Sequence, residues 1–344
     1  MGLAAGRNGD IPVVIMKSNL TEEIFKVTDA QSFEKVALEI FRFQAAECPV
    51  YREYINLLDI DIEGIGDIFS IPFMPVSFFR DHAVMTGGGE PERIFLSSGT
   101  AEMRQSRHMV KELALYDESL ERAFRIFYGD PSGYAIMGLL PSYLEREGSS
   151  LIYMVKRLMT LSGNENGGFF LDDYAGLLRS IEKSRAAGFK VLLIGVTFAL
   201  LDLAERCPGN LGDVIIMETG GMKGRRREMI REEVHEIIRK AFGVTTVHSE
   251  YGMTELLSQA YSRGGGLFRT PSWMQVLIRD SHDPTSHSVA AGAVGGISVI
   301  DLANIWSCSF IATADLGRMH EEGLFEVQGR FDEADLRGCN LLVS

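Results

Sequence analysis

Residues 191–205 read VLLIGVTFALLDLAE, an unbroken apolar run followed by a segment with helical periodicity. The run over residues 191–196 is typical of a strand that is buried on both faces of a sheet. The residues from Thr197 to Glu205 predict a helix directly after it. A strand that leads at once into a helix is the repeating unit of an α/β fold.

The same alternation continues on both sides of this unit. Further predicted strands cover residues 134–140, 214–217 and 244–248. Further predicted helices cover residues 150–161, 172–187 and 226–242. We therefore expect an α/β sheet with helices on both of its faces.

The regions that flank this core are patterned differently. Thr28 and Gln31 fit a capping box in front of a helical run over residues 33–46. Residues 71–76 contain two prolines and are expected to be extended. A helix is therefore expected near the N-terminus, joined to the core by extended chain.

Two apolar stretches near the C-terminus, residues 295–301 and 324–327, predict strands with no helix between them. They indicate a small β-rich C-terminal portion beside the mixed sheets and their helices. Residues 1–15 are expected to be a flexible leader, since their apolar run is too short for a signal peptide. We expect one domain over residues 16–344.

Composition excludes several classes of protein. The net charge of −13 argues against a nucleic-acid partner, because phosphate backbones bind basic surfaces. The four cysteines are scattered without a CxxC pair, which favours reduced thiols and a cytoplasmic location. No stretch approaches 18 apolar residues, so no transmembrane segment is expected.

Two loops carry residues suited to phosphates and a flat ring. Ser97-Ser98-Gly99-Thr100 follows a predicted strand over residues 93–96 and precedes a helix expected to begin near Ser106. Such a loop can turn N–H groups and hydroxyls toward a polyphosphate, although a plain solvated turn is the alternative. Gly220-Gly221 also follows a strand, and glycines there let the backbone approach a ring closely. A flexible crossover loop is the alternative.

Three further segments carry ring, carboxylate and guanidinium groups. Tyr251-Gly252-Met253-Thr254-Glu255 could stack a base on its ring and hold Mg²⁺ with Glu255, or be an ordinary glycine turn. Asp315 could accept hydrogen bonds from a ribose, or belong to an Asx-turn. Arg330, after Gly329, could pair with phosphate or ribose oxygens, or lie in a solvated β-turn.

In this order the five segments resemble the acyl-adenylate-forming superfamily, which includes acyl-CoA synthetases, adenylation domains and luciferase. The resemblance covers the chain from Ile71 to its end, and it implies adenylation of a carboxylic acid with ATP and Mg²⁺. It implies catalytic roles for Glu255 and Arg330, with Glu255 as the metal ligand. It implies that ATP is bound by Ser97, Ser98, Gly99, Thr100, Gly220, Gly221, Tyr251, Gly252, Thr254, Asp315 and Arg330.

Residues 71–79, 140–146 and 149–151 carry a closer resemblance, to the acyl-protein synthetase family of the bacterial bioluminescence fatty-acid reductase complex. This resemblance implies that the acyl group passes from AMP to a cysteine near the C-terminus, here Cys339, and then to a partner reductase. A shortened acyl-CoA ligase and a non-catalytic nucleotide-binding subunit are the alternatives. An apolar acid is expected, because twenty Phe and fifteen Met can line an adaptable channel.

The sequence departs from the superfamily pattern in two places. The chain ends soon after the hinge-like Gly329-Arg330, so we expect the separate lid domain to be absent, together with its lysine. The phosphate loop also lacks the usual Gly-Lys ending and has Arg104 nearby instead.

Overall fold

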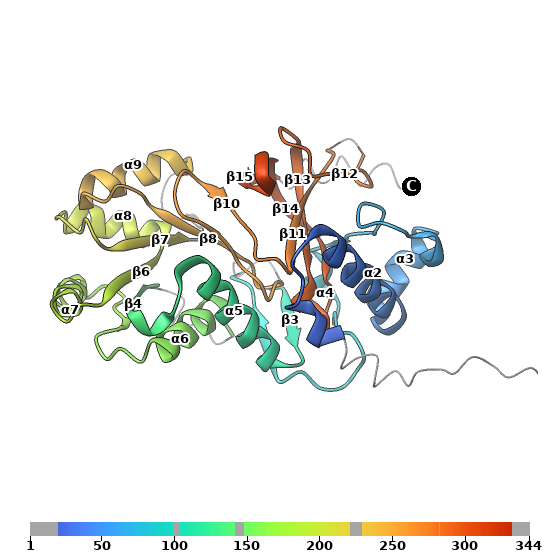
Figure 1. Cartoon of the computed structure of the whole chain (residues 1–344), viewed down its shortest axis with the longest axis horizontal. Helices are drawn as coiled ribbons and strands as arrows, with labels where there is room; N and C mark the ends of the chain where they lie inside the picture. The colour runs from blue at the N-terminus through green and yellow to red at the C-terminus, as the bar shows by residue number, and fades with distance from the viewer. Residues whose placement is uncertain (1–19, 99–103, 142–147, 221–228, 282, 332–344) are drawn as a thin grey trace, which may run out of the picture.

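The computed structural model describes residues 20–98, 104–141, 148–220, 229–281 and 283–331. Two large sheets organise these residues, with helices around and between them (Figure 1). The expected α/β architecture, with mixed sheets flanked by helices, is confirmed. The expected leader over residues 1–15 lies outside the described residues.

The first large sheet has six strands in the order β5-β4-β6-β7-β8-β9, all parallel except β9. Its strands are β4 (Tyr134–Leu139), β5 (Gly168–Phe169), β6 (Lys190–Val196), β7 (Ile215–Thr219), β8 (His248–Tyr251) and β9 (Ala260–Ser262). Every residue of β4 is buried, as is every residue of β6 after Lys190. Continuous apolar runs give this pattern because helices cover both faces.

The helices of this sheet divide between its two faces. They are α5 (Leu113–Tyr128), α6 (Ser150–Ser162), α7 (Tyr174–Ala186), α8 (Thr197–Arg206) and α9 (Arg231–Phe242). The chain moves in one direction across the sheet from β4 to β5, through α6. It then moves in the opposite direction from β5 to β6, β7 and β8, through α7, α8 and α9. Right-handed crossovers therefore place α6 on one face and the other three on the opposite face. In Figure 1, α7, α8 and α9 lie at the outer left side of the molecule.

The second large sheet has seven strands and is mainly antiparallel, with the order β10-β15-β14-β13-β11-β12 and β1 parallel to β14. Its strands are β1 (Met74–Pro75), β10 (Leu267–Phe268), β11 (Met274–Arg279), β12 (His287–Ser288), β13 (Val294–Asp301), β14 (Phe310–Met319) and β15 (Phe325–Arg330). The expected β-rich C-terminal portion is thus confirmed. The expected extended segment over residues 71–76 contains β1.

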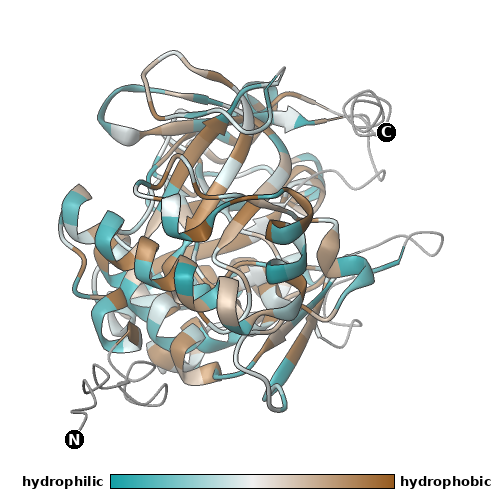
Figure 2. Ribbon diagram, turned by 90° about the vertical axis from the view of Figure 1, so that its right-hand side faces the viewer, coloured by the Kyte–Doolittle hydropathy of each residue, from teal (hydrophilic) through white to brown (hydrophobic). Residues whose placement is uncertain are grey.

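The remaining elements complete the layers. They are helices α2 (Ala30–Glu47), α3 (Pro49–Leu57) and α4 (Phe78–Asp81), strands β2 (Arg93–Leu96) and β3 (Arg107–Val110), and the 3₁₀ turns Ile62–Gly64, Pro131–Gly133, Leu302–Asn304 and Glu321–Gly323. Phe41 of α2 and Tyr51 of α3 pack their rings against Phe310 of β14. Figure 2 shows hydrophobic strands inside and helices of mixed character around them.

Most predicted elements match the structure, and four details were wrong. The segment expected to begin a helix near Ser106 is strand β3, which pairs with β2. Strand β8 begins at His248 instead of at residue 244, because the register with β7 starts there. Helix α9 begins at Arg231, later than predicted. The helix cap is Asp29, whose carboxylate accepts a hydrogen bond from Ser32 N at 2.8 Å, in place of Thr28 and Gln31.

Candidate active site

The carboxyl ends of β6, β7 and β8 lie side by side at one edge of the six-stranded sheet. Val196 pairs with Thr219, and Thr219 pairs with Glu250. The chain leaves these strands at Thr197, Gly220 and just after Tyr251. Ligands in α/β proteins bind beyond this edge, and two of the five predicted segments therefore begin next to each other.

Tyr251, Asp315 and Arg330 meet through direct hydrogen bonds. The Tyr251 hydroxyl donates to Asp315 Oδ2 at 2.9 Å, and Arg330 Nε donates to Asp315 Oδ1 at 3.0 Å. Tyr251 and Asp315 are each 8% exposed, whereas the Arg330 side chain is 72% exposed. Burial, and then the charge of Asp315, raise the pKa of Tyr251 well above its usual value, so its hydroxyl remains a donor. Three predicted segments therefore share one contact between the two large sheets.

Asp315 lies within strand β14, so the alternative of an Asx-turn at this position was wrong. Thr313 orients it: the Thr313 hydroxyl donates to Ile297 O at 2.8 Å and accepts from Asp315 N at 3.1 Å. Arg330 likewise lies in strand β15, where it is the registered partner of Asp315. The strand pairing, rather than a pair of turns, brings the carboxylate and the guanidinium together.

Glu255 is buried beside this group, with 5% of its surface exposed. Burial raises its pKa, while a hydrogen bond from the Ser106 side chain and the charge of Arg330 act in the opposite direction. A raised pKa favours the neutral carboxyl group, so a nearby cation would favour its ionisation. Glu255 thus connects the Asp315–Arg330 pair to the strand that follows the phosphate loop.

The predicted phosphate loop leaves β2 next to Ser106. Ser97 Oγ accepts from Ser106 N at 2.9 Å, and Ser97 N donates to Ser106 O at 3.0 Å. Ser98 is exposed. Gly99 and Thr100 lie outside the described residues. Ser106 therefore contacts both Ser97, at the base of this loop, and Glu255. Arg104, further along, lies 3.6 Å from Asp81 in an exposed ion pair.

The glycines of the predicted site have identifiable backbone roles. Gly220 has a φ of +70°, and its carbonyl accepts from the Thr197 hydroxyl at 2.9 Å. A Cβ atom at Gly252 would clash with Oε1 of Glu250, so a side chain there would displace that carboxyl group. Gly221 and Cys339 lie outside the described residues.

His108 and Asn304 hold the turn that contains Thr254 and Glu255. One ring nitrogen of His108 lies 2.8 Å from Thr254 O, and the other lies 2.9 Å from Asn304 Oδ1. Asn304 Nδ2 donates to Glu255 O at 2.8 Å. Sequence reasoning missed both residues, and no local pattern marks them, because their partners are distant in the chain.

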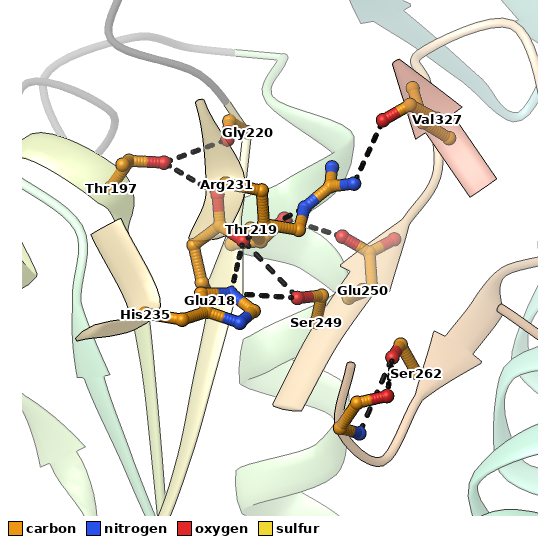
Figure 3. A network of polar contacts seen from close by, with 11 residues as sticks. Thr197, Glu218, Thr219, Gly220, Arg231, His235, Ser249, Glu250, Ser262 and Val327 are labelled. Carbon is orange, nitrogen blue, oxygen red and sulfur yellow. Dashed lines mark hydrogen bonds and ion pairs between the residues drawn. The ribbon is translucent and has the colours of Figure 1, made fainter. Parts of the chain in front are cut away.

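Glu218 lies two residues before Gly220 and collects donors from several elements (Figure 3). Its carboxylate accepts from the Thr197 hydroxyl at 2.8 Å and from the Ser249 hydroxyl at 3.2 Å, and His235 Nε2 lies 3.4 Å away. Burial alone would raise the pKa of Glu218, but His235, Arg231 and Thr197 together lower it. Sequence reasoning gave Glu218 no role. Its one signal was an acidic residue at the end of an apolar strand.

The structure limits what kinds of site the described residues form. Among them, no group of three or more His, Cys, Asp or Glu residues could hold a metal ion by itself. In the same residues, no helix is long and apolar enough to cross a membrane.

Solved structures share this fold at low sequence identity, whereas no protein-family model and no curated protein matches the sequence. A 2-hydroxyisobutyryl-CoA ligase in an open conformation, bound to 2-HIB-AMP and CoA, is similar over 89% of this chain and 77% of that chain, with 13% identity and a TM-score of 0.62. The same ligase in its thioesterification state is similar over 89% of this chain and 70% of that chain, with 13% identity and a TM-score of 0.64.

O-succinylbenzoate coenzyme A synthetase from Bacillus subtilis, in complex with AMP, is also similar, over 71% of this chain and 62% of that chain, with 17% identity and a TM-score of 0.50. These likenesses cover most of this chain. At such identities they establish the architecture alone. The chain therefore has the α/β fold of acyl-adenylate-forming ligases, as its sequence predicted.

Proposed function

We propose that this protein activates a carboxylic acid with ATP to give an acyl-AMP, and then transfers the acyl group to a thiol. The main support is the hydrogen-bonded group of Tyr251, Asp315 and Arg330, which joins three of the predicted nucleotide-binding segments. Glu255, from the same segment as Tyr251, lies next to this group, and the contact between Ser97 and Ser106 adds a fourth segment.

Asp315 is the proposed ribose ligand. A carboxylate offers about four acceptor positions, and Tyr251 and Arg330 take one on each oxygen. Each oxygen of Asp315 therefore has one position left, which suits the two hydroxyls of a ribose. Gly220 and Gly221 would lie against the adenine, beside Tyr251, Gly252 and Thr254.

The phosphates would lie over the loop of Ser97, Ser98, Gly99 and Thr100. Mg²⁺ prefers oxygen ligands and commonly binds through one or two carboxylates plus substrate phosphates. Glu255 and the hydroxyl of Ser106 fit this donor set. When bound, the ion would offset the negative charge that develops on the departing phosphates. Arg330, whose charge already acts on Glu255, would add a positive charge.

The first step forms a mixed anhydride. A carboxylate oxygen of the substrate attacks the α-phosphorus of ATP, and the bond between that phosphorus and the β-phosphate oxygen breaks. Pyrophosphate leaves with the electron pair of the broken bond. Positioning and charge neutralisation dominate such a reaction, and the residues around Asp315 would supply both.

In the second step a thiolate attacks the acyl carbon, and AMP leaves. We propose Cys339 as this thiol, in keeping with the resemblance to acyl-protein synthetases, and a reductase as the partner that receives the acyl group. The acid would be apolar, such as a fatty acid. CoA as the acceptor is the alternative within the same chemistry.

Acid-dependent ATP–pyrophosphate exchange tests the first step. We expect wild-type protein to catalyse exchange with at least one member of a panel of fatty and aromatic acids. Asp315→Asn should raise the KM for ATP by about 10- to 100-fold, since hydrogen bonds to charged groups contribute about 1.5–3 kcal/mol. Asp283→Asn, a change at an exposed carboxylate in the loop before β12, is the matched control and should leave exchange unchanged.

One outcome would argue against this function, and another against the proposed nucleotide site. ATP binding without exchange for any acid would favour a non-catalytic nucleotide-binding subunit. Wild-type kinetics in Asp315→Asn would remove Asp315 from the nucleotide site.

Intact-protein mass spectrometry tests the acceptor. After incubation with ATP, Mg²⁺ and a competent acid, we expect one acyl adduct that hydroxylamine removes. Cys339→Ser should abolish the adduct but retain pyrophosphate exchange, and Cys207→Ser should retain both. Adduct-free protein that makes acyl-CoA would instead identify CoA as the acceptor.

A further inference from the structure

Arg231, the first residue of α9, contacts three parts of the candidate active site, although the proposed chemistry does not use it. Its Nη1 donates to Val327 O at 3.0 Å, and its Nε lies 3.7 Å from Glu218 Oε2. Its guanidinium lies over the ring of Phe268, at 5.1 Å from the centroid. Figure 3 shows this side chain between the Glu218 group and Val327.

The first contact reaches the six-stranded sheet at the Gly220 loop. Glu218 is buried, and the Thr197 hydroxyl lies within hydrogen-bond distance of both Glu218 Oε1 and Gly220 O. This hydroxyl has one proton for two acceptors, so the charge on Glu218 influences which of them receives it. Arg231 therefore acts on the start of the proposed adenine loop through Glu218.

The second contact reaches the seven-stranded sheet at β15. Val327 lies three residues before Arg330, which is paired with Asp315 across the β14–β15 register. The hydrogen bond from Arg231 fixes the carbonyl of Val327 relative to α9. The hydrogen bond thereby holds β15, which carries Arg330 of the Asp315–Arg330 pair, in place relative to α9, the helix that packs on the six-stranded sheet.

The third contact reaches the aromatic group that encloses Tyr251. The Phe268 ring stacks on Phe325 with centroids 5.4 Å apart, and the Tyr251 ring meets both of them edge-on. Arg231 covers the Phe268 side of this group. A Cβ atom at Gly266 would lie 3.4 Å from Arg231 Cδ, so the β9–β10 connection packs directly on the arginine stem.

We infer that Arg231 is a positioning residue, which sets the placement of the two large sheets relative to each other where they would grip the nucleotide. Glu218 is its buried counter-charge. A planar guanidinium can hold the carboxylate, the Val327 carbonyl and the Phe268 ring at the same time, which a lysine ammonium cannot do. This inference rests on the proposed function only for its kinetic test.

The kinetic test compares Arg231→Met, Arg231→Lys and wild type in the pyrophosphate exchange reaction. Arg231→Met should raise the KM for ATP by about tenfold and change kcat by less than about threefold, because the reacting groups are intact but the nucleotide contacts are misplaced. Arg231→Lys should fall between the two. Arg185→Met is the matched control. It removes an exposed arginine of α7 that pairs with Asp213, and it should behave as wild type.

Hydrogen exchange gives a second test that does not depend on activity. In Arg231→Met the amides of β10 and β15 should exchange at least about tenfold faster, while those of β4 and β6 stay unchanged. Arg185→Met should alter neither set. If wild type shows no acid-dependent exchange of pyrophosphate, the proposed function fails, but this measurement still tests the positioning role.

A double variant tests the pairing with Glu218. Removing one member of a buried charge pair leaves the other uncompensated, whereas removing both does not. Arg231→Met combined with Glu218→Gln should therefore be less destabilised than the sum of the two single variants.

Three results would overturn the inference. The first is wild-type KM together with wild-type amide exchange in Arg231→Met. The second is an equal increase in exchange across β4 and β15, which would indicate a general loss of stability. The third is strict additivity of the two substitutions.

Discussion

Glu250 is a half-buried carboxyl group near the end of β8. Thr219 donates a hydrogen bond to it from the neighbouring strand, and Glu218 is a like-charged neighbour. Burial raises the pKa of Glu250 to about 7, and the charge of Glu218 contributes to this increase to a lesser extent. Tyr116 of α5 and Tyr261 of β9 also interact with this carboxyl group. Protonation of Glu250 is therefore favoured in the folded protein.

This raised pKa predicts a pH-dependent stability. Between its unfolded pKa, near 4.5, and its folded pKa, about 7, Glu250 binds more protons in the folded state. Its contribution is thus fully present below pH 4.5 and is lost as the pH rises through 7. The loss is at most about 3 kcal/mol, from about 1.4 kcal/mol per pKa unit. Urea unfolding at pH 5 to 8 should show it.

Glu250→Gln should remove this slope, because an amide does not titrate. Glu236→Gln, on the exposed side of α9, is the control and should keep the slope. A wild-type free energy of unfolding that is flat or rising over the same pH range would contradict the assignment of Glu250 as a neutral, half-buried acid.

Site residues could be predicted where a short sequence motif marks them, and not where their role depends on contacts with residues distant in the chain. Tyr251, Asp315 and Arg330 were singled out from short motifs, and the structure shows that they are in contact. Glu218 and Arg231 could not be predicted in the same way. Their importance comes from contacts with Val327 and Ser249, which exist only after the sheets have formed.

At the scale of elements, the β2–β3 pair supports the turn after β8. Strand β3 places His108 against Thr254 and Asn304, and both ring nitrogens face oxygen acceptors. Burial lowers the pKa of His108 to about 4, so at neutral pH the ring has one proton and donates to one acceptor at a time. The contact holds the turn in place from the side of the phosphate loop.

Removal of this support should destabilise the protein. His108→Leu removes the one hydrogen bond that the ring donates to Thr254 O or Asn304 Oδ1, and leaving that buried acceptor unsatisfied costs about 1–3 kcal/mol. The free energy of unfolding in urea measures this loss. The exposed His82→Leu should change it by less than about 0.5 kcal/mol. Equal stabilities of the two variants would show that His108 does not hold the turn.

The error over β3 has a physical explanation. Residues 106–113 contain few apolar residues, and their alternation is masked because the buried side of β3 includes His108, a polar residue. The apolar strands β4, β6 and β7 were predicted correctly, because burial on both faces requires long apolar runs that are visible in the sequence. Strands with polar inward-facing residues give no such pattern.

At the scale of the whole molecule, the candidate site belongs to neither sheet alone. Gly220 and Tyr251 come from the six-stranded sheet, Asp315 and Arg330 from the seven-stranded sheet, and Ser97 from the strand pair β2–β3. A nucleotide held by all of these residues would bind only to the assembled chain. Its binding energy would then add to the stability of the whole fold.

ATP should therefore raise the temperature of thermal unfolding. At a concentration of 100 times its Kd, a ligand that binds only the folded state adds about 2.7 kcal/mol, which corresponds to an increase of about 4 °C for a chain of this size. Differential scanning fluorimetry with Mg²⁺ and increasing ATP measures the shift. Asp315→Asn should lose most of it, whereas Asp283→Asn should show the wild-type shift. An equal shift in Asp315→Asn would place bound ATP elsewhere, and the convergence of Tyr251, Asp315 and Arg330 would then be a structural contact between the sheets.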